Sequence, residues 1–312
     1  MTDFSVDPWD PGYAAALAVE ALAELGATSA ELVLDIEAGP MEWGPVRPRG
    51  EAPKSLLVAD GVRRIDARVW VRSDDDPMPV PGIAASYAAG MVRCGPGGAD
   101  LAAVEIGRTL ISASPYTPEV KTPHATYAPR QAAGPSMEEL SLALQRQVTQ
   151  LEVDVAVRYR ADSDDLLLVD GPLRGRSHLP ATVGYIKTHH TAYLPAPQAA
   201  VVSELAPGER TPVFLMGTSW RRHAWYVRLP VRSATPWAGV ARCEASAELA
   251  AEDVVRLADE VTLALLPLAG VDYKDPRAPQ NLVPIGGLEK LLRHHLGDAR
   301  LLYRALRTAA QG

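Results

Sequence analysis

Two carboxylates in this sequence each follow a short apolar run and precede a glycine. The first run, Leu56–Ala59, leads into Asp60-Gly61, and the second, Leu166–Val169, leads into Asp170-Gly171. Apolar runs of this length predict buried strands, and a following glycine predicts a sharp turn. A carboxylate at the end of a buried strand must be ion-paired, hydrogen-bonded or metal-bound, because burial of a lone charge is costly. Asp60 and Asp170 are therefore the first candidates for chemistry.

A third acidic candidate lies on a predicted helix between the two runs. Ser136 and Glu139 form a capping box, which opens a helix expected to reach about Tyr159. Its apolar stripe consists of Leu140, Leu144, Val148, Leu151 and Val155. Glu152 lies at one edge of this stripe and Asp154 at the opposite edge, so the helical period alone does not choose between them.

Three carboxylates delivered from two strand ends and one helix can form a divalent-metal site. Two Mn²⁺ or Mg²⁺ ions held about 4 Å apart would activate a water and stabilise the leaving oxygen of a phosphodiester. We expect Asp60, Glu152 and Asp170 to hold the ions. The competing interpretation is that Asp-Gly is only a turn signal and that Glu152 is a solvated helix residue.

Other residues that could take part in chemistry also have structural interpretations. Lys187 ends a predicted strand. In a functional role it would contact a phosphate or hold the attacking water, and otherwise it would be a surface lysine. Asp66 is expected to face outward from a strand. Two histidine pairs could each supply at most one metal ligand, because adjacent side chains point in different directions. These pairs are His189-His190 and His294-His295.

An aromatic and basic stretch is the candidate for nucleic-acid contact. Trp220, Arg221 and Arg222 open the segment Trp220–Tyr226. Aromatic rings stack on bases and arginines bind phosphates, although core packing of the aromatic residues is at least as plausible.

Composition and charge limit the classes of protein. The chain has 312 residues and a formal net charge of −7, and residues 1–50 hold nine acidic and two basic residues, which leaves equal numbers in the remainder. No apolar run reaches the length of a membrane span, and the N-terminus lacks the features of a signal peptide. Cys94 and Cys243 are the only cysteines, so reduced thiols in the cytoplasm are expected. Without a P-loop motif, the chain should not hydrolyse ATP.

The order of predicted elements indicates an α/β protein with a mixed sheet flanked by helices. Residues 1–50 form an acidic segment with a helix over 11–26, packed on the core or on a partner, and residues 51–312 form the main domain. A hairpin is expected to turn near 61–63. Residues 82–135 are expected to hold one strand, 101–112, between long loops. Further strands are predicted at 166–170, 182–187, 211–216 and 224–229, and helices at 247–266, 287–296 and 298–309.

The ordered set of Asp60-Gly61, Glu152, Asp170-Gly171 and the strand ending at Lys187 resembles the NurA nuclease family. The segment Asp275–Glu289 is similar to the bacterial branch of that family. The resemblance implies an RNase H-like core with long loop insertions and a manganese-dependent (or magnesium-dependent) exo- or endonuclease acting on single- and double-stranded DNA ends. It also implies a homodimer that works in DNA repair with a HerA-type hexameric ATPase during end resection.

The resemblance further implies roles for individual residues. Asp60, Glu152 and Asp170 match metal ligands, and Lys187 matches a lysine of the same site. The family often adds a C-terminal histidine, whereas this chain has Asn281 in the corresponding stretch. Asn281 could substitute, or His294 or His295 could fold back. The departure keeps open an alternative in which the chain is a non-catalytic subunit that regulates the ATPase or its loading on DNA.

Overall fold

The computed structural model describes residues 31–73, 76–160, 165–187, 193–218, 220–231, 237–271 and 278–311. The expected helix over 11–26 and the His189-His190 pair lie outside these residues. Among the helices that are described, none combines the length and the apolar character needed to cross a membrane.

The described strands form one mixed sheet of eleven, in the order β1-β9-β10-β11-β8-β7-β2-β3-β4-β6-β5. The chain divides into two compact units. The first runs to Val58 and adds Arg93–Asp100 and Ser163–Gly286, whereas the second holds Ala59–Val92, Leu101–Asp162 and Gly287–Gly312. The predicted α/β class with a mixed sheet and flanking helices is confirmed.

The described strands of the first unit include both parallel and antiparallel pairs. β7 and β8 run parallel, with Asp170 opposite Tyr185, while β8–β11, β11–β10, β10–β9 and β9–β1 pair antiparallel. Its elements are β1 (Glu31–Val33), β7 (Leu166–Asp170), β8 (Thr182–Ile186), α3 (Ala196–Glu204), β9 (Phe214–Gly217), β10 (Arg221–Arg228), β11 (Val240–Ser246), α4 (Ala251–Leu265) and the 3₁₀ turn η1 (Leu266–Leu268).

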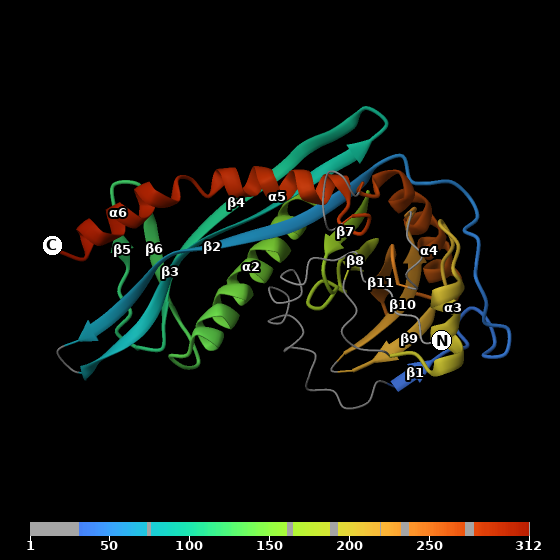
Figure 1. Ribbon diagram of the computed structural model, residues 1–312, viewed down its shortest axis with the longest axis horizontal. Coiled ribbons are helices and arrows are strands. Elements are labelled where there is room, and N and C mark those ends of the chain that lie inside the picture. The colour runs from blue at the N-terminus through green and yellow to red at the C-terminus, as the bar shows by residue number, and fades with distance from the viewer. Residues whose placement is uncertain are drawn as a thin grey trace, which may run out of the picture. The chain divides into compact units, whose positions relative to one another are not determined.

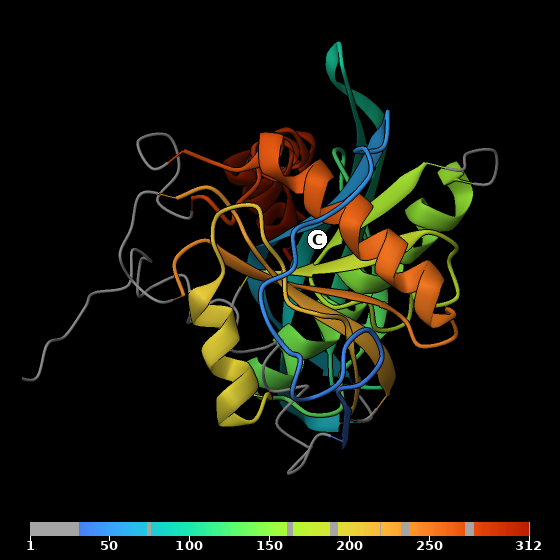
Figure 2. The ribbon, with the colours of Figure 1, turned by 90° about the vertical axis from the view of Figure 1, so that its right-hand side faces the viewer.

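Both faces of strand β10 are buried, each for its own reason. Ala224 and Tyr226 lie in an apolar cluster with Val202 and Leu205 from α3 and the residue that follows it. Because side chains alternate along a strand, Trp225 points to the other face, and α4 packs against β10. Figure 2 shows α3 in yellow and α4 in orange beside these strands. Almost every residue of β10 is consequently buried, Arg221 being the exposed one.

The second unit is built around long strands (Figure 1). Its elements are β2 (Leu56–Ser73, which begins in the first unit), β3 (Asp76–Gly95), β4 (Gly98–Ser112), β5 (Val120–Lys121), β6 (Thr126–Gln131), α2 (Met137–Arg160), α5 (Val283–His295, which also begins in the first unit) and α6 (Ala299–Ala309). The turn between β3 and β4 belongs to the first unit. β4 and β6 pair parallel, and β5 and β6 pair antiparallel.

Alternation along β3 and β4 also buries both faces of this sheet region. Ala85 and Ile111 pack with Leu140 and Leu144 of α2. Their neighbours Ala84 and Leu110 belong to a second cluster that includes Leu306 of α6. Figure 1 shows α2 along β2 and β3, and α6 next to β5 and β6. Strands buried on both faces carry apolar residues at successive positions, as Ile83–Ala85 do.

The predicted hairpin at 61–63 is wrong, because β2 continues without a turn from Leu56 to Ser73. Gly61 has a different purpose. A Cβ at this position would lie 2.7 Å from Val148 Cγ1 and closer still to the Glu152 carboxylate, both on α2. The glycine therefore allows close approach of a helix rather than a reversal of the chain.

The prediction of long loops over 82–135 is also wrong. The expected strand 101–112 is present as the major part of β4, but β3, β5 and β6 were missed. β3 contains Pro77, Pro79 and Pro81 followed by an alanine-rich stretch, and both features argue against a strand by propensity. Burial against α2 and α6 outweighs that propensity, and small residues fit where helices pack closely, as at Gly90 beside Leu292.

Candidate metal centre

Asp60 is a buried carboxylate within β2, 7 % exposed. Its Oδ1 accepts a hydrogen bond of 2.7 Å from the backbone N–H of Gly61. The sequence prediction placed Asp60 at the end of a strand, whereas the structure places it at the fifth position of an eighteen-residue strand. Burial of its carboxylate matches the expectation drawn from the apolar run before it.

Glu152 of α2 lies against the same stretch of β2. It is buried, and its carboxylate fills the space that a side chain at position 61 would occupy. Asp154 is exposed and accepts a hydrogen bond of 2.9 Å from Gln150 Nε2 on its own helix. The packing of α2 thus distinguishes Glu152 from Asp154, which the helical period left equivalent. It places Glu152 beside Gly61, the residue after Asp60.

Asp170 ends β7 as predicted, and Gly171 adopts φ +105°, which a residue with a side chain rarely does. Lys187 Nζ donates to Asp170 Oδ2 at 2.6 Å and to Asn281 Oδ1 at 3.0 Å. Lys187 is 8 % exposed, so it is not a surface lysine. Parallel strands end at the same edge of a sheet, which explains why residues at the ends of β7 and β8 meet.

A buried ion network supports the loop that follows Asp170. Glu244 Oε2 accepts the backbone N–H of Leu173 at 3.2 Å, and Glu244 Oε1 pairs with Arg222 at 2.8 Å and Arg242 at 3.1 Å. Tyr185 Oη donates to the carbonyl of Gln280 at 2.8 Å, next to Asn281. These contacts fix both the loop after β7 and the segment that carries Asn281.

Glu289 was not among the residues selected from the sequence. It lies on α5 next to buried Leu288 and three positions before buried Leu292, and its side chain is 14 % exposed. Arg293 Nη2 lies 3.8 Å from Glu289 Oε2. The sequence signal that could have identified Glu289 is an acid beside the apolar stripe of an amphipathic helix. The same signal led to the selection of Glu152.

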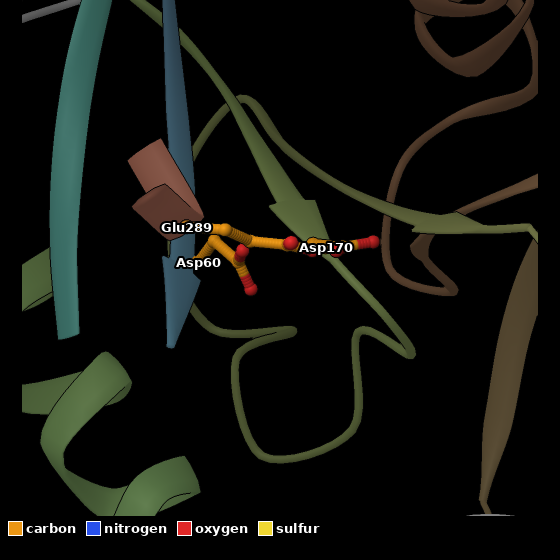
Figure 3. Close-up of side chains that lie close together, drawn as sticks. All are labelled: Asp60, Asp170 and Glu289. Carbon is orange, nitrogen blue, oxygen red and sulfur yellow. The ribbon is translucent and has the colours of Figure 1, made fainter. Parts of the chain in front are cut away.

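One oxygen from each of Asp60, Asp170 and Glu289 lies within 4.8 Å of the others (Figure 3). β2, β7 and α5 supply the three carboxylates. Two members of this cluster were selected from the sequence, and Glu152 does not belong to it. An acidic triad of this kind could bind a divalent cation, because Mg²⁺ and Ca²⁺ take oxygen ligands and a cation offsets the repulsion among like charges.

The remaining candidate ligands lie elsewhere in the described part of the chain. His294 and His295 are exposed at the end of α5, with ring centres 6.3 Å apart, and neither belongs to the acidic cluster. Asn281 contacts Lys187 as described above. Cys94 and Cys243 are buried and unbonded, and burial raises the pKa of both thiols, which disfavours the reactive thiolate.

The predicted nucleic-acid contacts divide into exposed and buried residues. Arg222 is 0 % exposed, pairs with Glu244, and stacks 4.5 Å from the ring centre of Trp220. Its guanidinium therefore does not face solvent, contrary to the expectation, because β10 is covered on both faces. Arg221 is exposed and Trp220 is half-buried, and their contact with nucleic acid stays a prediction.

Asp66 does not face outward as expected. Its buried carboxylate accepts hydrogen bonds from Ser86, from Tyr127 at 3.0 Å and from Arg64 at 2.8 Å. Arg64 also donates to the Gly297 carbonyl at 2.8 Å, just after the end of α5. Asp66 is thus an anchor for that helix end.

Comparisons with known proteins give remote likenesses among solved structures. No model of a known protein family matches the sequence, and neither does any curated protein. Among solved structures, the chain is similar to the crystal structure of the NurA nuclease from Sulfolobus solfataricus, with a TM-score of 0.48 and 10 % identity. The likeness covers 95 % of this chain and 93 % of that one.

Proposed function

We propose that this chain is a metal-dependent nuclease that hydrolyses phosphodiester bonds. The observation that carries the proposal is the acidic cluster of Asp60, Asp170 and Glu289, whose oxygens lie within 4.8 Å of one another. Ligand oxygens around a hard cation lie about 2.0–2.6 Å from it, so oxygens on the same ion are at most about 4–5 Å apart. The all-carboxylate donor set suits a hard divalent cation such as Mn²⁺ or Mg²⁺, and oxygens within 4.8 Å of one another are close enough to gather around one bound ion.

The chain's own residues have distinct roles in this proposal. Asp60, Asp170 and Glu289 would hold the cation, and Glu152, beside Gly61, would hold a second ion or orient the water. A bound divalent cation supplies an activated water and stabilises the leaving oxygen. Lys187 holds Asp170 by one oxygen and thereby fixes the direction of the other. Glu244 and Arg222 maintain the loop after Asp170 through the Leu173 N–H.

DNA is the proposed substrate, and the support for it is the sequence resemblance to the bacterial branch of the NurA family. The same resemblance supports action at DNA ends in repair, a homodimer in the cytoplasm, and a HerA-type ATPase as partner.

The acidic N-terminal segment is the proposed docking element for that partner. Residues 31–50 contribute Glu37, paired with Arg210 at 2.7 Å, and Trp43, packed on Phe214, so the deletion that tests docking should remove only residues 1–30. Unchanged affinity for the ATPase would refute the docking role.

The proposal is tested by cleavage of end-labelled duplex and single-stranded DNA in Mn²⁺. Asp60→Asn and Asp170→Asn should each lower the rate at least about 100-fold, because each removes a ligand charge while keeping the side-chain shape. Asp154→Asn is the matched control, since Asp154 is exposed and its hydrogen bond is to Gln150 of its own helix. Equal loss in the control, or full activity in both cluster variants, would refute the proposal. Unlabelled RNA as competitor distinguishes an RNA-directed enzyme.

A non-catalytic subunit is the second candidate, and one contact favours it. The Lys187 ammonium at 2.6 Å already neutralises Asp170, so the fold can be stable without a cation. In that case wild-type protein would cleave no DNA with or without an ATPase partner, yet would change the rate of ATP hydrolysis by that partner.

A further inference from the structure

The C-terminal helices carry positive charge on a chain that is negative overall. Residues 287–312 contain five Lys or Arg and two acidic residues, against a net charge of −7 for the whole chain. All five cations are exposed: Lys290, Arg293, Arg300, Arg304 and Arg307. The excess therefore lies on the surface of α5 and α6.

Helix α6 separates its charged and apolar residues onto opposite faces. Leu302 and Leu306 are buried, and Leu306 packs on the sheet with Val71 and Leu110. Arg300, Arg304 and Arg307 follow each other at spacings of four and three and so form one stripe, about 150° from the buried leucines at 100° per residue. Tyr303, 46 % exposed, borders this stripe. These four residues are the α6 basic face.

Part of the α6 basic face borders a shallow, open depression, and its arginines are exposed to solvent. Ala299, Arg300, Tyr303 and Arg304 line an open depression of about 520 Å³. The Arg307 guanidinium lies 6.0 Å from the ring centre of Tyr303. Within the described part of the chain, no ion pair joins Arg300, Arg304 or Arg307 to a carboxylate. Asp298, the nearest acid in the sequence, caps α6 by accepting the Leu301 N–H at 2.8 Å.

The α6 basic face has a fixed relation to α5, which carries Glu289. Only Leu296–Asp298 separate the two helices. Arg64 donates to the Gly297 carbonyl at 2.8 Å and is itself held by buried Asp66. The turn between the helices is thereby tied to β2, so a ligand on α6 would lie in a defined position relative to Glu289.

We infer that the α6 basic face binds single-stranded nucleic acid and guides it toward the acidic cluster. Arginines bind phosphates with planar, multi-donor groups, and an exposed tyrosine among them provides a surface for stacking unpaired bases. Duplex DNA offers phosphates but no free base faces, so the tyrosine selects a single strand. The inference deepens the proposed nuclease function and rests on it for the fate of the bound strand.

Binding of a fluorescent 20-nucleotide single strand, measured by anisotropy in chelator, tests this inference without any cleavage. Arg300→Ala/Arg304→Ala should weaken binding at least tenfold and lower the salt dependence, by about 0.7 in the logarithmic slope for each lost phosphate contact. Tyr303→Ala should weaken binding roughly tenfold, while Tyr303→Phe should retain it. The control Arg158→Ala/Arg256→Ala removes two exposed helical arginines that pair with acids elsewhere, and it should bind like wild type.

Three outcomes would overturn the inference: unchanged affinity in the double variant, equal loss in the control, or α6 substitutions that instead weaken binding of a peptide comprising residues 1–30.

Hydrolysis of bis(p-nitrophenyl) phosphate in Mn²⁺ distinguishes failure of this inference from failure of the nuclease proposal. That small ester reports the acidic cluster alone, so the α6 variants should hydrolyse it at the wild-type rate. Normal ester hydrolysis with unaltered strand binding would leave the nuclease proposal standing and remove only the role of α6.

Discussion

At the scale of single residues, the Asp170–Lys187 ion pair offsets part of the negative charge of the acidic cluster. The lysine ammonium lies 2.6 Å from one Asp170 oxygen and also holds Asn281. Both charged side chains are largely buried, and such a pair is expensive to break because the remaining charge is left uncompensated. A cation bound by the cluster would share Asp170 with this lysine.

Replacement of Lys187 tests that balance. Lys187→Met should lower the free energy of unfolding by about 3 kcal/mol, and Mn²⁺ should restore part of it because the cation replaces the lost positive charge. Thermal unfolding with and without Mn²⁺ measures both effects, and the Mn²⁺-induced rise in melting temperature should be larger in Lys187→Met than in wild type. Lys121→Met is the control, since Lys121 is exposed and, among the residues that the structure describes, its ion pair is with the exposed Glu119. An equal or smaller Mn²⁺ effect in Lys187→Met would contradict the shared role.

At the scale of elements, the two Asp-Gly pairs show what a local pattern can predict. Both were expected to be turns. Gly171 is one, with φ +105°, whereas Gly61 lies inside a continuous strand and makes room for α2. The residue types are identical, so only tertiary packing separates a turn from a close approach. Capping, by contrast, is local: Ser136 and Glu139 form the predicted reciprocal hydrogen bonds at the start of α2.

The packing role of Gly61 gives a test at the same scale. Gly61→Ala should destabilise the protein by about 1–3 kcal/mol, because the new methyl group collides with Val148 and displaces Glu152. Chemical denaturation measures the loss. Gly44→Ala is the matched control, as a Cβ there meets no atom within 4 Å, and it should be tolerated. If Gly61→Ala were as stable as the control, α2 would not pack against β2 as described.

Strand β10 carries a buried histidine, His223, whose titration should affect the pH dependence of the protein's stability. Burial lowers the pKa of His223 from its ordinary value of 6.5, although a contact of 3.2 Å with the Leu249 carbonyl partly opposes this. The unfolded chain therefore binds a proton first as pH falls, and stability should decline from about pH 6.5 downward to the folded pKa. His223→Gln should flatten that part of the stability curve, while His124→Gln, at an exposed site, should not. Parallel curves for wild type and His223→Gln would contradict this assignment.

For the whole molecule, the sequence predicted the α/β class and the elements with strong local signals. The strand before Asp170, the strand before Lys187, helix α2 and the two closing helices were predicted close to their observed limits. The long strand β3 was not, because its prolines and alanines lack strand propensity and its stability comes from helices distant in sequence.

Only part of the candidate site could be predicted from the sequence, because local patterns reveal some of its residues and tertiary packing brings in the others. Asp60 and Asp170 stood out because each follows an apolar run. Glu289 did not, because one acid beside a helical stripe is common and only the fold brings its oxygen within 4.8 Å of the other two. Arg222 was misjudged as a surface cation, since pairing with Glu244 on a neighbouring strand cannot be read from local sequence.

A crystal structure of the protein soaked in Mn²⁺, with anomalous scattering data, tests the central claim most directly. We predict an anomalous peak within about 2.0–2.6 Å of carboxylate oxygens of Asp60, Asp170 and Glu289, and its loss in Asp60→Asn crystals. An ion-free cluster under saturating Mn²⁺, or carboxylate oxygens too distant to share one ion, would contradict the claim.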